Sequence, residues 1–300
     1  MNVQIQPTQE QIDHWIEKYV PEKDLFFLRE KELLNFVDYL HEVLVIPKDE
    51  FFNHASYLQI QLVNSYEYWG ISNDIQYVIL AHSGWVTTLS SETRATLFSI
   101  QVSINRGLIL PLSLFSEPDE VSTEFIVKKK GEPYVVLQNN MWKKLSFSNK
   151  EKAIQAYALE WDSWESLEVP DNIPAHLKKY ANSFSTDAGA NCLAATLYAI
   201  SNHSERNEWI INEWVHQKTF TQGLKNAQYS ITDDELTVGD VVTWINAEGI
   251  IQHAAYHLGD HLFFNKNGQT FFNPWKIINW KELNEEWSAY TYRIYRKAHN

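Results

Sequence analysis

The feature that most constrains the fold is a series of three short apolar segments in the C-terminal half of the chain, each followed by turn residues. They read DVVTWIN (240–246), IQHAAYHL (251–258) and HLFFNKNG (261–268), with turns at Glu248-Gly249, Gly259-Asp260 and Asn267-Gly268. Short apolar segments bounded in this way are typical of antiparallel strands joined by tight turns. The tail SAYTYRIYRK (288–297) alternates in polarity and predicts one more strand.

Helical patterns precede these strands. NCLAATLYAI predicts a helix that begins at or near Cys192 and ends at about Ser201, and RNEWIINEWVHQK (206–218) predicts a second helix. Helices followed by an antiparallel sheet make an α+β arrangement. We therefore predict an α+β domain over residues 171–300.

Residues 1–170 predict a mainly helical N-terminal domain. Apolar residues follow helical spacing in 24–44 and in 90–107, and the second of these segments opens with serine and ends at Gly107. Near 121–147, β-branched and aromatic residues broken by turn residues predict a meander of three strands. The apolar segments that fit either a strand or a buried helix are 57–63 and 75–89.

The boundary between the two domains is expected between about 145 and 175. Ser148 and Glu151 have the spacing of a capping box and predict a helix after the meander. VPDNIPAHLKKYANSF (169–184) contains two prolines and reads as a connector into a short helix. We place the boundary after residue 170.

Charge and cysteine content limit the partners and the compartment. Asp and Glu outnumber Lys and Arg by 38 to 25, giving a formal net charge of −13, and an acidic surface repels phosphate, so we expect no nucleic-acid partner. No signal peptide is apparent, and no segment has the roughly 18 consecutive apolar residues that a spanning helix needs. A single cysteine forms no intrachain disulfide, so we expect a cytoplasmic protein without a membrane span. The oligomeric state is left open.

The only cysteine, Cys192, follows a small-residue turn, DAGAN (187–191), at the start of the predicted helix. A free cysteine often packs as a small hydrophobe, so a structural role is one interpretation. Its position favours a nucleophile, because the unpaired N–H groups and the dipole at a helix N-terminus lower the pKa of a thiol and stabilise an oxyanion. Gly189 leaves room for a substrate to approach.

His253 is the predicted base for this thiol. Alternation in the strand places His253, Ala255 and His257 on one face, and the small neighbours leave the imidazole accessible. A half-buried sheet histidine is the alternative interpretation. Asn265, on the next strand of a hairpin, is predicted to lie beside His253 and to accept its other N–H. The competing residues, both in the turn, are Asp260 and His261.

Together these elements resemble the NlpC-type branch of papain-like cysteine peptidases and amidases. The recurring run of that family is Gly-Asp before an apolar strand, then His-x-small-x-Tyr-x-Gly, then a third polar residue on the next strand. The matching residues here are Gly239-Asp240 with Val241–Ile245, then His253, Tyr256 and Gly259, and finally Asn265. The resemblance covers about residues 183–295 and implies a papain-like domain in which the nucleophile helix packs on an antiparallel sheet.

The resemblance also implies a function. It implies a cysteine hydrolase that cleaves an amide bond in a peptide or peptidoglycan-like substrate through a thioester acyl-enzyme, without a cofactor. The implied triad is Cys192, His253 and Asn265, with Asn191, Gly189 and Tyr256 next to the oxyanion or the substrate. The alternatives are a thiol-dependent acyltransferase or deacylase acting on a lipid or small amide, and a non-catalytic binding protein that retains the fold.

Two departures limit how far the resemblance extends. Family members that cut bacterial cell-wall peptides usually carry an acidic residue before the cysteine and a serine after it, where this chain has Asn191 and Leu193. The thiol mechanism is therefore better supported than a cell-wall substrate.

The histidines at 253, 257 and 261 are four residues apart, but a strand–turn–strand arrangement does not place them on one side, so we expect no metal site.

Overall fold

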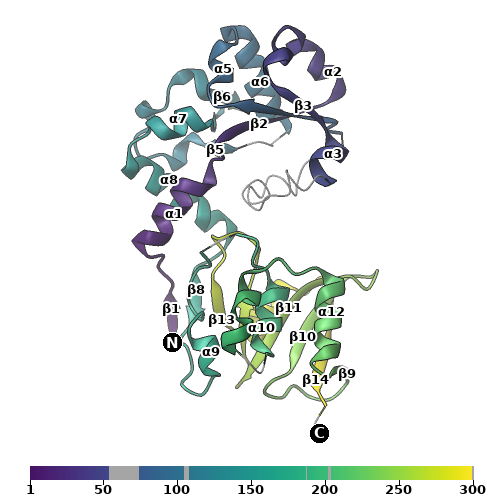
Figure 1. Cartoon of the computed structure of the whole chain (residues 1–300). Coiled ribbons are helices and arrows are strands. Elements are labelled where there is room, and N and C mark those ends of the chain that lie inside the picture. The colour runs from purple at the N-terminus through teal and green to yellow at the C-terminus, as the bar shows by residue number, and fades with distance from the viewer. Residues whose placement is uncertain (54–73, 105–107, 187, 202–203, 299–300) are drawn as a thin grey trace. The chain divides into compact units, whose positions relative to one another are not determined.

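The computed structural model describes residues 1–300 except 54–73, 105–107, 187, 202–203 and 299–300 (Figure 1). Contacts divide the chain into a C-terminal unit, Met1–Gln11 with Ala158–Asn300, and an N-terminal unit, Ile12–Tyr157. The predicted boundary lies after residue 170 and counts the first residues with the N-terminal domain. In the structure, the first residues belong to the C-terminal unit because β1 pairs there with β8.

A six-stranded antiparallel sheet, with strand order β13-β12-β11-β10-β14-β9, forms the centre of the C-terminal unit. Its strands are β9 (Tyr229–Thr232), β10 (Val241–Ile245), β11 (Ile251–Gly259), β12 (Leu262–Lys266), β13 (Trp275–Asn279) and β14 (Thr291–Lys297). A separate antiparallel pair consists of β1 (Asn2–Gln4) and β8 (Glu165–Leu167). The helices are α9 (Ala175–Lys178), α10 (Cys192–Ala199), α11 (Ser204–Asn207), the 3-10 helix η6 (Glu208–Asn212), α12 (Gln217–Asn226) and α13 (Trp280–Glu286).

Strand register divides the side chains of this sheet between two faces. Trp244 of β10 lies opposite His253 of β11, so both point to the same side of the sheet, where Trp244 packs with Leu283 of α13. We call this side the α13 face. Ala254 and Tyr256 alternate with these residues and pack with α10 and α12 on the other side, the α10 face (Figure 1).

The four predicted strands of this unit and the predicted helix at Cys192 are confirmed. Segments 240–246, 251–258, 261–268 and 288–297 correspond to β10, β11, β12 and β14, and α10 begins at Cys192. The predicted helix over 206–218 is wrong: α11 and η6 occupy its first part, and α12 begins only at Gln217. The backbone leaves the helix between them, and the Val215 carbonyl accepts a hydrogen bond from the Asn191 side chain.

The N-terminal unit is mixed α/β. Its described residues form more helix than strand, as expected, but they also form two three-stranded antiparallel sheets, of which the prediction included only a meander near 121–147. Its strands are β2 (Lys23–Leu28), β3 (Leu44–Pro47), β4 (Tyr77–His82), β5 (Ile109–Pro111), β6 (Ile126–Lys129) and β7 (Glu132–Val136). Its helices are α1 (Gln9–Tyr19), α2 (Glu30–Leu33), α3 (Lys48–Asn53), α5 (Trp85–Thr88), α6 (Ser91–Ile104), α7 (Asn139–Lys144) and α8 (Phe147–Trp161). The first residues of α1 and the last residues of α8 belong to the C-terminal unit. The 3-10 helices are η1 (Leu34–Glu42), η3 (Leu112–Leu114), η4 (Pro118–Glu120) and η5 (Thr123–Phe125).

Short apolar runs account for the errors in this unit. Phe26, Phe27 and Leu28 are all buried within β2, and a continuous apolar run of this length fits a buried strand as well as a helix. The predicted third strand of the meander is instead α7, and β5 supplies the third strand of that sheet. Segment 57–63 and the predicted stop at Gly107 lie outside the described residues, whereas 75–89 contains β4 and α5.

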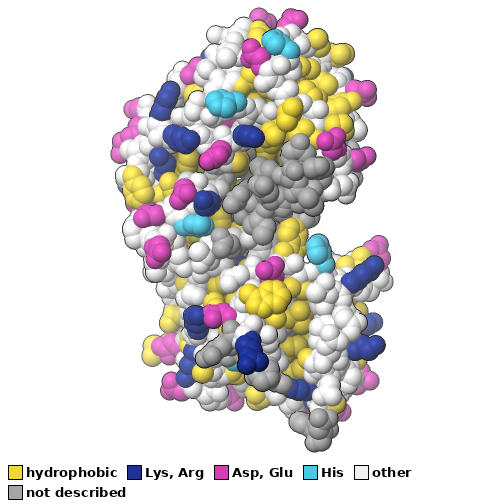
Figure 2. All heavy atoms as spheres, in the orientation of Figure 1, with side chains coloured by type: hydrophobic (Ala, Val, Ile, Leu, Met, Phe, Trp, Pro, Cys, Tyr) yellow, Lys and Arg dark blue, Asp and Glu magenta, His cyan; other side chains and the backbone are white. Residues whose placement is uncertain are grey.

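Charged side chains of both signs lie on the drawn face of the molecule (Figure 2). On the face drawn in Figure 2, lysine and arginine side chains lie among aspartate and glutamate side chains. Within the described part of the chain, no helix combines the length and the apolar character needed to cross a bilayer.

A buried ion pair ties the end of α8 to the edge strand β13. Lys276 Nζ lies 2.6 Å from Asp162 Oδ1 and donates to the Ser163 carbonyl at 2.8 Å. The two charged side chains are only 5% and 3% exposed. Next to this pair, the Ser166 hydroxyl accepts from Ile277 N and donates to Ile277 O, so a side chain occupies the edge of β13.

We predict that Asp162→Ala lowers the free energy of unfolding by about 3–5 kcal/mol, because it leaves a buried ammonium without its partner. The double variant Asp162→Leu, Lys276→Met is expected to recover most of that loss, since neither charge is then buried. Urea unfolding followed by tryptophan fluorescence measures both. Glu160→Ala, at an exposed neighbouring carboxylate, is the control. A loss below about 1 kcal/mol for Asp162→Ala contradicts the role of this pair.

Candidate active site

Asn191 starts the helix that carries Cys192. Its backbone is extended, with φ −123° and ψ 175°, and its Oδ1 accepts from Ala194 N at 2.9 Å, which is an N-cap hydrogen bond. Its Nδ2 donates to Val215 O at 2.8 Å. Both groups of the buried Asn191 side chain are thus engaged in structural hydrogen bonds. A role beside the oxyanion or the substrate stays a prediction for this residue.

The turn before Cys192 needs its glycine. Gly189 has φ 110°, in the left-handed region that L side chains rarely adopt, and its N–H donates to Gln269 O at 2.7 Å. Ala188 and Ala190 on either side are buried. This turn is therefore packed against the loop between β12 and β13. Asp187, the first residue of the predicted turn, lies outside the described residues.

Cys192 is half-buried, and its side chain packs against the apolar cluster on the α10 face. Burial raises its pKa to about 11, although the backbone N–H groups of Ala254, Leu193 and Cys192 itself, and the charge of Lys266, act in the opposite direction. The N–H groups at the helix N-terminus thus act on this pKa in the expected direction, but the net shift is upward. These N–H groups favour the thiolate, but the loss of hydration on burial has the larger effect.

His253 and Asn265 form the hydrogen bond that the sequence predicts. His253 Nε2 lies 2.6 Å from Asn265 Oδ1, and each residue is 1% exposed. The ring of Trp287 stacks on the imidazole with 4.2 Å between centroids and 6° between planes, and Trp244 lies 5.6 Å away. Burial in this aromatic layer lowers the pKa of His253 to about 4, so the imidazole is neutral at pH 7.

Cys192 and the imidazole approach β11 from different sides. Cys192 packs with the apolar cluster on the α10 face, whereas His253 shares the α13 face with Trp244. The sulfur is close to the N–H of Ala254, the residue that follows His253 in the strand. The structure thus brings Cys192 to the strand position next to His253. A proton-transfer contact between the two side chains stays a prediction.

The sequence analysis missed Lys266, which follows Asn265 in β12. Its side chain is buried on the α10 face, where Nζ donates to Thr270 O at 3.0 Å and to Asn273 O, and lies 5.6 Å from the centre of the Trp275 ring. Burial lowers its pKa to about 7, and its charge interacts with Cys192. A lysine at an inward-facing position of an apolar strand was the available signal.

Tyr256 is not brought to the nucleophile. It lines a cavity with Ala199 and Ile200, at the C-terminal end of α10, while Cys192 is at the N-terminal end. The helix runs along β11, and Tyr256 lies three positions after His253 in that strand. Tyr256 as a substrate-adjacent residue therefore finds no support in its position.

The other histidines of the motif are occupied elsewhere. His257 Nδ1 lies 2.7 Å from Thr237 O, and Asp260 and His261 form the turn after β11 with φ 49° and 58°. Asp260 and His261 therefore do not compete with Asn265 for His253. Among the described residues, no three His, Cys, Asp or Glu side chains are grouped as a metal site requires.

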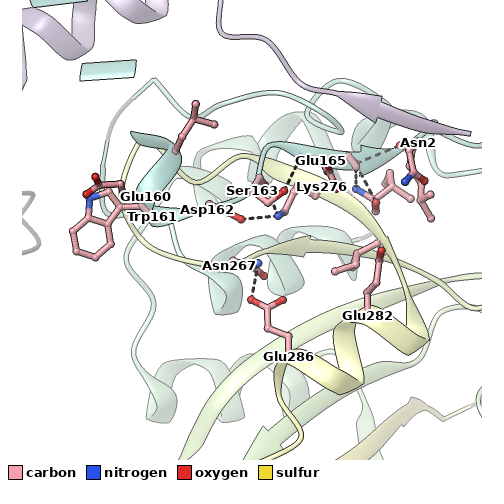
Figure 3. Close-up of a pocket in the computed structure, with 15 residues that line it drawn as sticks. Asn2, Glu160, Trp161, Asp162, Ser163, Glu165, Asn267, Lys276, Glu282 and Glu286 are labelled. Carbon is pink, nitrogen blue, oxygen red and sulfur yellow. Dashed lines mark hydrogen bonds and ion pairs between the residues drawn. The ribbon is translucent and has the colours of Figure 1, made fainter. Parts of the chain in front are cut away.

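A polar cavity of about 450 Å³ lies between α8, β13 and α13 (Figure 3). The Asp162–Lys276 pair, Asn267 and Glu286 are part of its lining. Neither Cys192 nor His253 lines it, so it is separate from the sulfur. Its link to the candidate site is Asn267, which accepts a hydrogen bond from Asn265.

We predict that Cys192 in the folded protein reacts slowly with iodoacetamide at pH 7 and that the rate keeps rising above pH 9. The reason is the burial that raises its pKa to about 11. The chain has one cysteine, so mass spectrometry of the intact protein reports this residue alone. In urea the same thiol should titrate near its ordinary pKa of about 8.5. A folded-state midpoint below pH 7 contradicts the prediction and indicates a thiolate–imidazolium pair.

Lys266 is predicted to make stability depend on pH. Its folded pKa of about 7 lies below that of the unfolded chain, about 10.4, so between these values the unfolded state binds a proton that the folded state lacks. The free energy of unfolding of the wild type, relative to Lys266→Met, should therefore rise from pH 7 to pH 9, by up to about 1.4 kcal/mol per unit. Below pH 7 the difference should be flat.

Urea unfolding of both proteins from pH 6 to pH 9 measures this slope. The exposed Lys281, replaced in the same way, is the matched control and should give no slope. An equal pH dependence for Lys266→Met and the wild type rules out a titrating Lys266 in this range.

Comparisons with known proteins leave the family open. No protein-family model matches the sequence, and no curated protein or solved structure matches the chain. The resemblance to NlpC-type enzymes therefore depends on the quoted residues alone. What the structure establishes about the class is a mixed α/β chain with antiparallel sheets.

Proposed function

We propose that this chain is a cysteine hydrolase that cleaves an amide bond in a peptide or peptidoglycan-like substrate, with the C-terminal unit as a papain-like, NlpC-type domain. Cys192 is the nucleophile, His253 the base and Asn265 the residue that orients the base. One observation carries the proposal: the buried 2.6 Å His253–Asn265 hydrogen bond lies on two strands whose next residues both act on the Cys192 sulfur, Ala254 through its backbone N–H and Lys266 through its charge.

The orientation of the imidazole supports a role as a base. With Nε2 bonded to Asn265 Oδ1 and one ring face covered by Trp287, the imidazole has Nδ1 left for proton transfer. A base must be neutral to accept a proton, and burial lowers the pKa of His253 to about 4. In this proposal the site therefore rests as a neutral thiol and a neutral imidazole, rather than as an ion pair.

The reaction then begins with a proton transfer coupled to attack. This step requires a rearrangement that brings the imidazole and the sulfur, which approach β11 from different sides, into contact. Nδ1 of His253 then takes the proton from Cys192 while the sulfur bonds to the carbonyl carbon, and the carbonyl oxygen gains the negative charge. In this proposal the N–H groups of Leu193 and Ala254, which lie close to the sulfur, donate to that oxygen. His253 next gives its proton to the leaving amine as the C–N bond breaks, which leaves a thioester on Cys192.

Water completes the cycle. His253, neutral again, takes a proton from a water molecule that attacks the thioester carbon, and the thiolate leaves and recovers the proton from the imidazolium. An amine or alcohol in place of water gives an acyltransferase through the same intermediate. A non-catalytic binding protein is the second candidate, and the observation that favours it is the approach of Cys192 and His253 from different sides of β11.

We predict that p-nitrophenyl acetate acylates Cys192 at pH 7.5 and that hydroxylamine removes the acetyl group. Mass spectrometry of the intact protein and of the peptide containing Cys192 detects the adduct. His253→Ala should lower the acylation rate by about 100-fold or more, because the general base is lost. Asn265→Ala should have a smaller effect, and Cys192→Ala should form no adduct at this position.

His261→Ala, at an exposed turn histidine, is the matched control and should leave the rate unchanged. Amino-acyl p-nitroanilides with and without glycinamide then separate hydrolysis from acyl transfer. If the folded wild type forms no thioester, or if His253→Ala acylates as fast as the wild type, the chain belongs with binding proteins.

A further inference from the structure

A chain of three hydrogen bonds leads from His253 to a surface carboxylate. His253 Nε2 lies 2.6 Å from Asn265 Oδ1, Asn265 Nδ2 donates to Asn267 Oδ1 at 2.6 Å, and Asn267 Nδ2 donates to Glu286 Oε1 at 2.8 Å. Glu286 is the last residue of α13 and lines the cavity of Figure 3, where its bond to Asn267 is drawn. The chain therefore connects the buried imidazole to the edge of that cavity.

The carboxylate at the end fixes the direction of every bond in the chain. Each asparagine amide can be turned so that either its oxygen or its nitrogen faces a neighbour. An ionised carboxylate accepts hydrogen bonds only, so Asn267 must turn its Nδ2 to Glu286 and its Oδ1 to Asn265. Asn265 then offers Nδ2 to Asn267, which leaves its Oδ1 for the imidazole.

This direction determines where the imidazole carries its proton. The Asn265 oxygen accepts only, so Nε2 must hold the hydrogen, and Nδ1 keeps its lone pair. If the chain were reversed, Asn265 would donate to Nε2 and the hydrogen would move to Nδ1. The ring could then no longer accept a proton at Nδ1.

We infer that Glu286, which touches neither Cys192 nor His253, selects the Nε2–H tautomer of His253 through Asn267 and Asn265. It is a positioning residue, and its catalytic consequence rests on the proposed function, whereas its effect on the tautomer does not. The neighbouring residue supports the same role, because Trp287 stacks on the imidazole. The end of α13 thus supplies both the ring that covers His253 and the acceptor that orients its hydrogen bond.

The test is to read the tautomer of His253 by NMR of the ¹⁵N-labelled full chain at pH 8. Burial raises the pKa of Glu286, and pH 8 lies far above the ordinary glutamate pKa of about 4.3. The wild type should give the Nε2–H pattern. Glu286→Lys replaces the acceptor by a donor and should make Nδ1–H the larger signal, and Glu286→Ala should give a mixture. Glu285→Lys is the matched control. The Glu285 side chain is on the same helix, is 68% exposed and takes no part in the three hydrogen bonds, so this variant should keep the wild-type pattern.

A double variant tests the direction of the bonds themselves. Asn267→Asp places an acceptor directly against Asn265 Nδ2, so Glu286→Ala combined with Asn267→Asp should restore the Nε2–H form. Near-ultraviolet circular dichroism checks that each variant is folded. If Glu286→Lys is unfolded, the comparison of Glu286→Ala with the double variant decides the matter.

The outcomes separate this inference from the proposed function. An unchanged Nε2–H pattern in folded Glu286→Lys and Glu286→Ala overturns the inference, whatever the activity. If the tautomer changes as expected, the Cys192 acylation rate of Glu286→Lys should fall about ten- to hundred-fold and recover in the double variant. A changed tautomer in a protein whose wild type forms no thioester supports the inference and rejects the proposed function.

Discussion

The antiparallel register of β11 with its neighbours is the constraint on which the rest of the C-terminal unit depends. Trp244 lies opposite His253, and one residue later the chain turns Ala254 to the other face. A shift of one residue would move His253 to the α10 face and expose Ala254 to the aromatic layer. The pairing of His253 with Asn265, the packing of α10 and the position of the sulfur all follow from this single register.

Burial away from water is the second constraint on the C-terminal unit, because it shifts the pKa values of three side chains. His253 and Lys266 lie on adjacent strands, and Cys192 packs against the sheet. Burial shifts the pKa of each of these groups in the direction that favours the neutral form. Loss of hydration disfavours the charged form of any group. It therefore raises the pKa of the thiol, which is charged when deprotonated, and lowers the pKa values of His253 and Lys266, which are charged when protonated. At pH 7 the thiol and the imidazole are therefore neutral, whereas Lys266, with a pKa of about 7, is about half protonated.

Local sequence was sufficient for four strands of the central sheet, but it did not identify β9 or β13 and was insufficient for the contacts between distant segments. Alternation and turn residues identify β10, β11, β12 and β14, and the step from small residues to an apolar run identifies α10. The pairing of His253 with Asn265 follows from the hairpin. Lys266 and Glu286 were missed because their roles depend on which residues the fold places around them, which periodicity does not report. In the N-terminal unit, short apolar runs fitted both helix and strand, and tertiary pairing selected strand.

The pairing of β1 with β8 makes the N-terminal unit an insertion within the other unit. Strand β1 lies in Met1–Gln11 and its partner β8 follows the whole of Ile12–Tyr157 in the sequence, so the two strands can pair only after that segment has been synthesised. During synthesis the N-terminal unit can therefore fold before β8 has been made, and β1 stays unpaired until then. The large sequence separation across this pair also makes it a slow contact to form, since the intervening chain must first be closed into a loop.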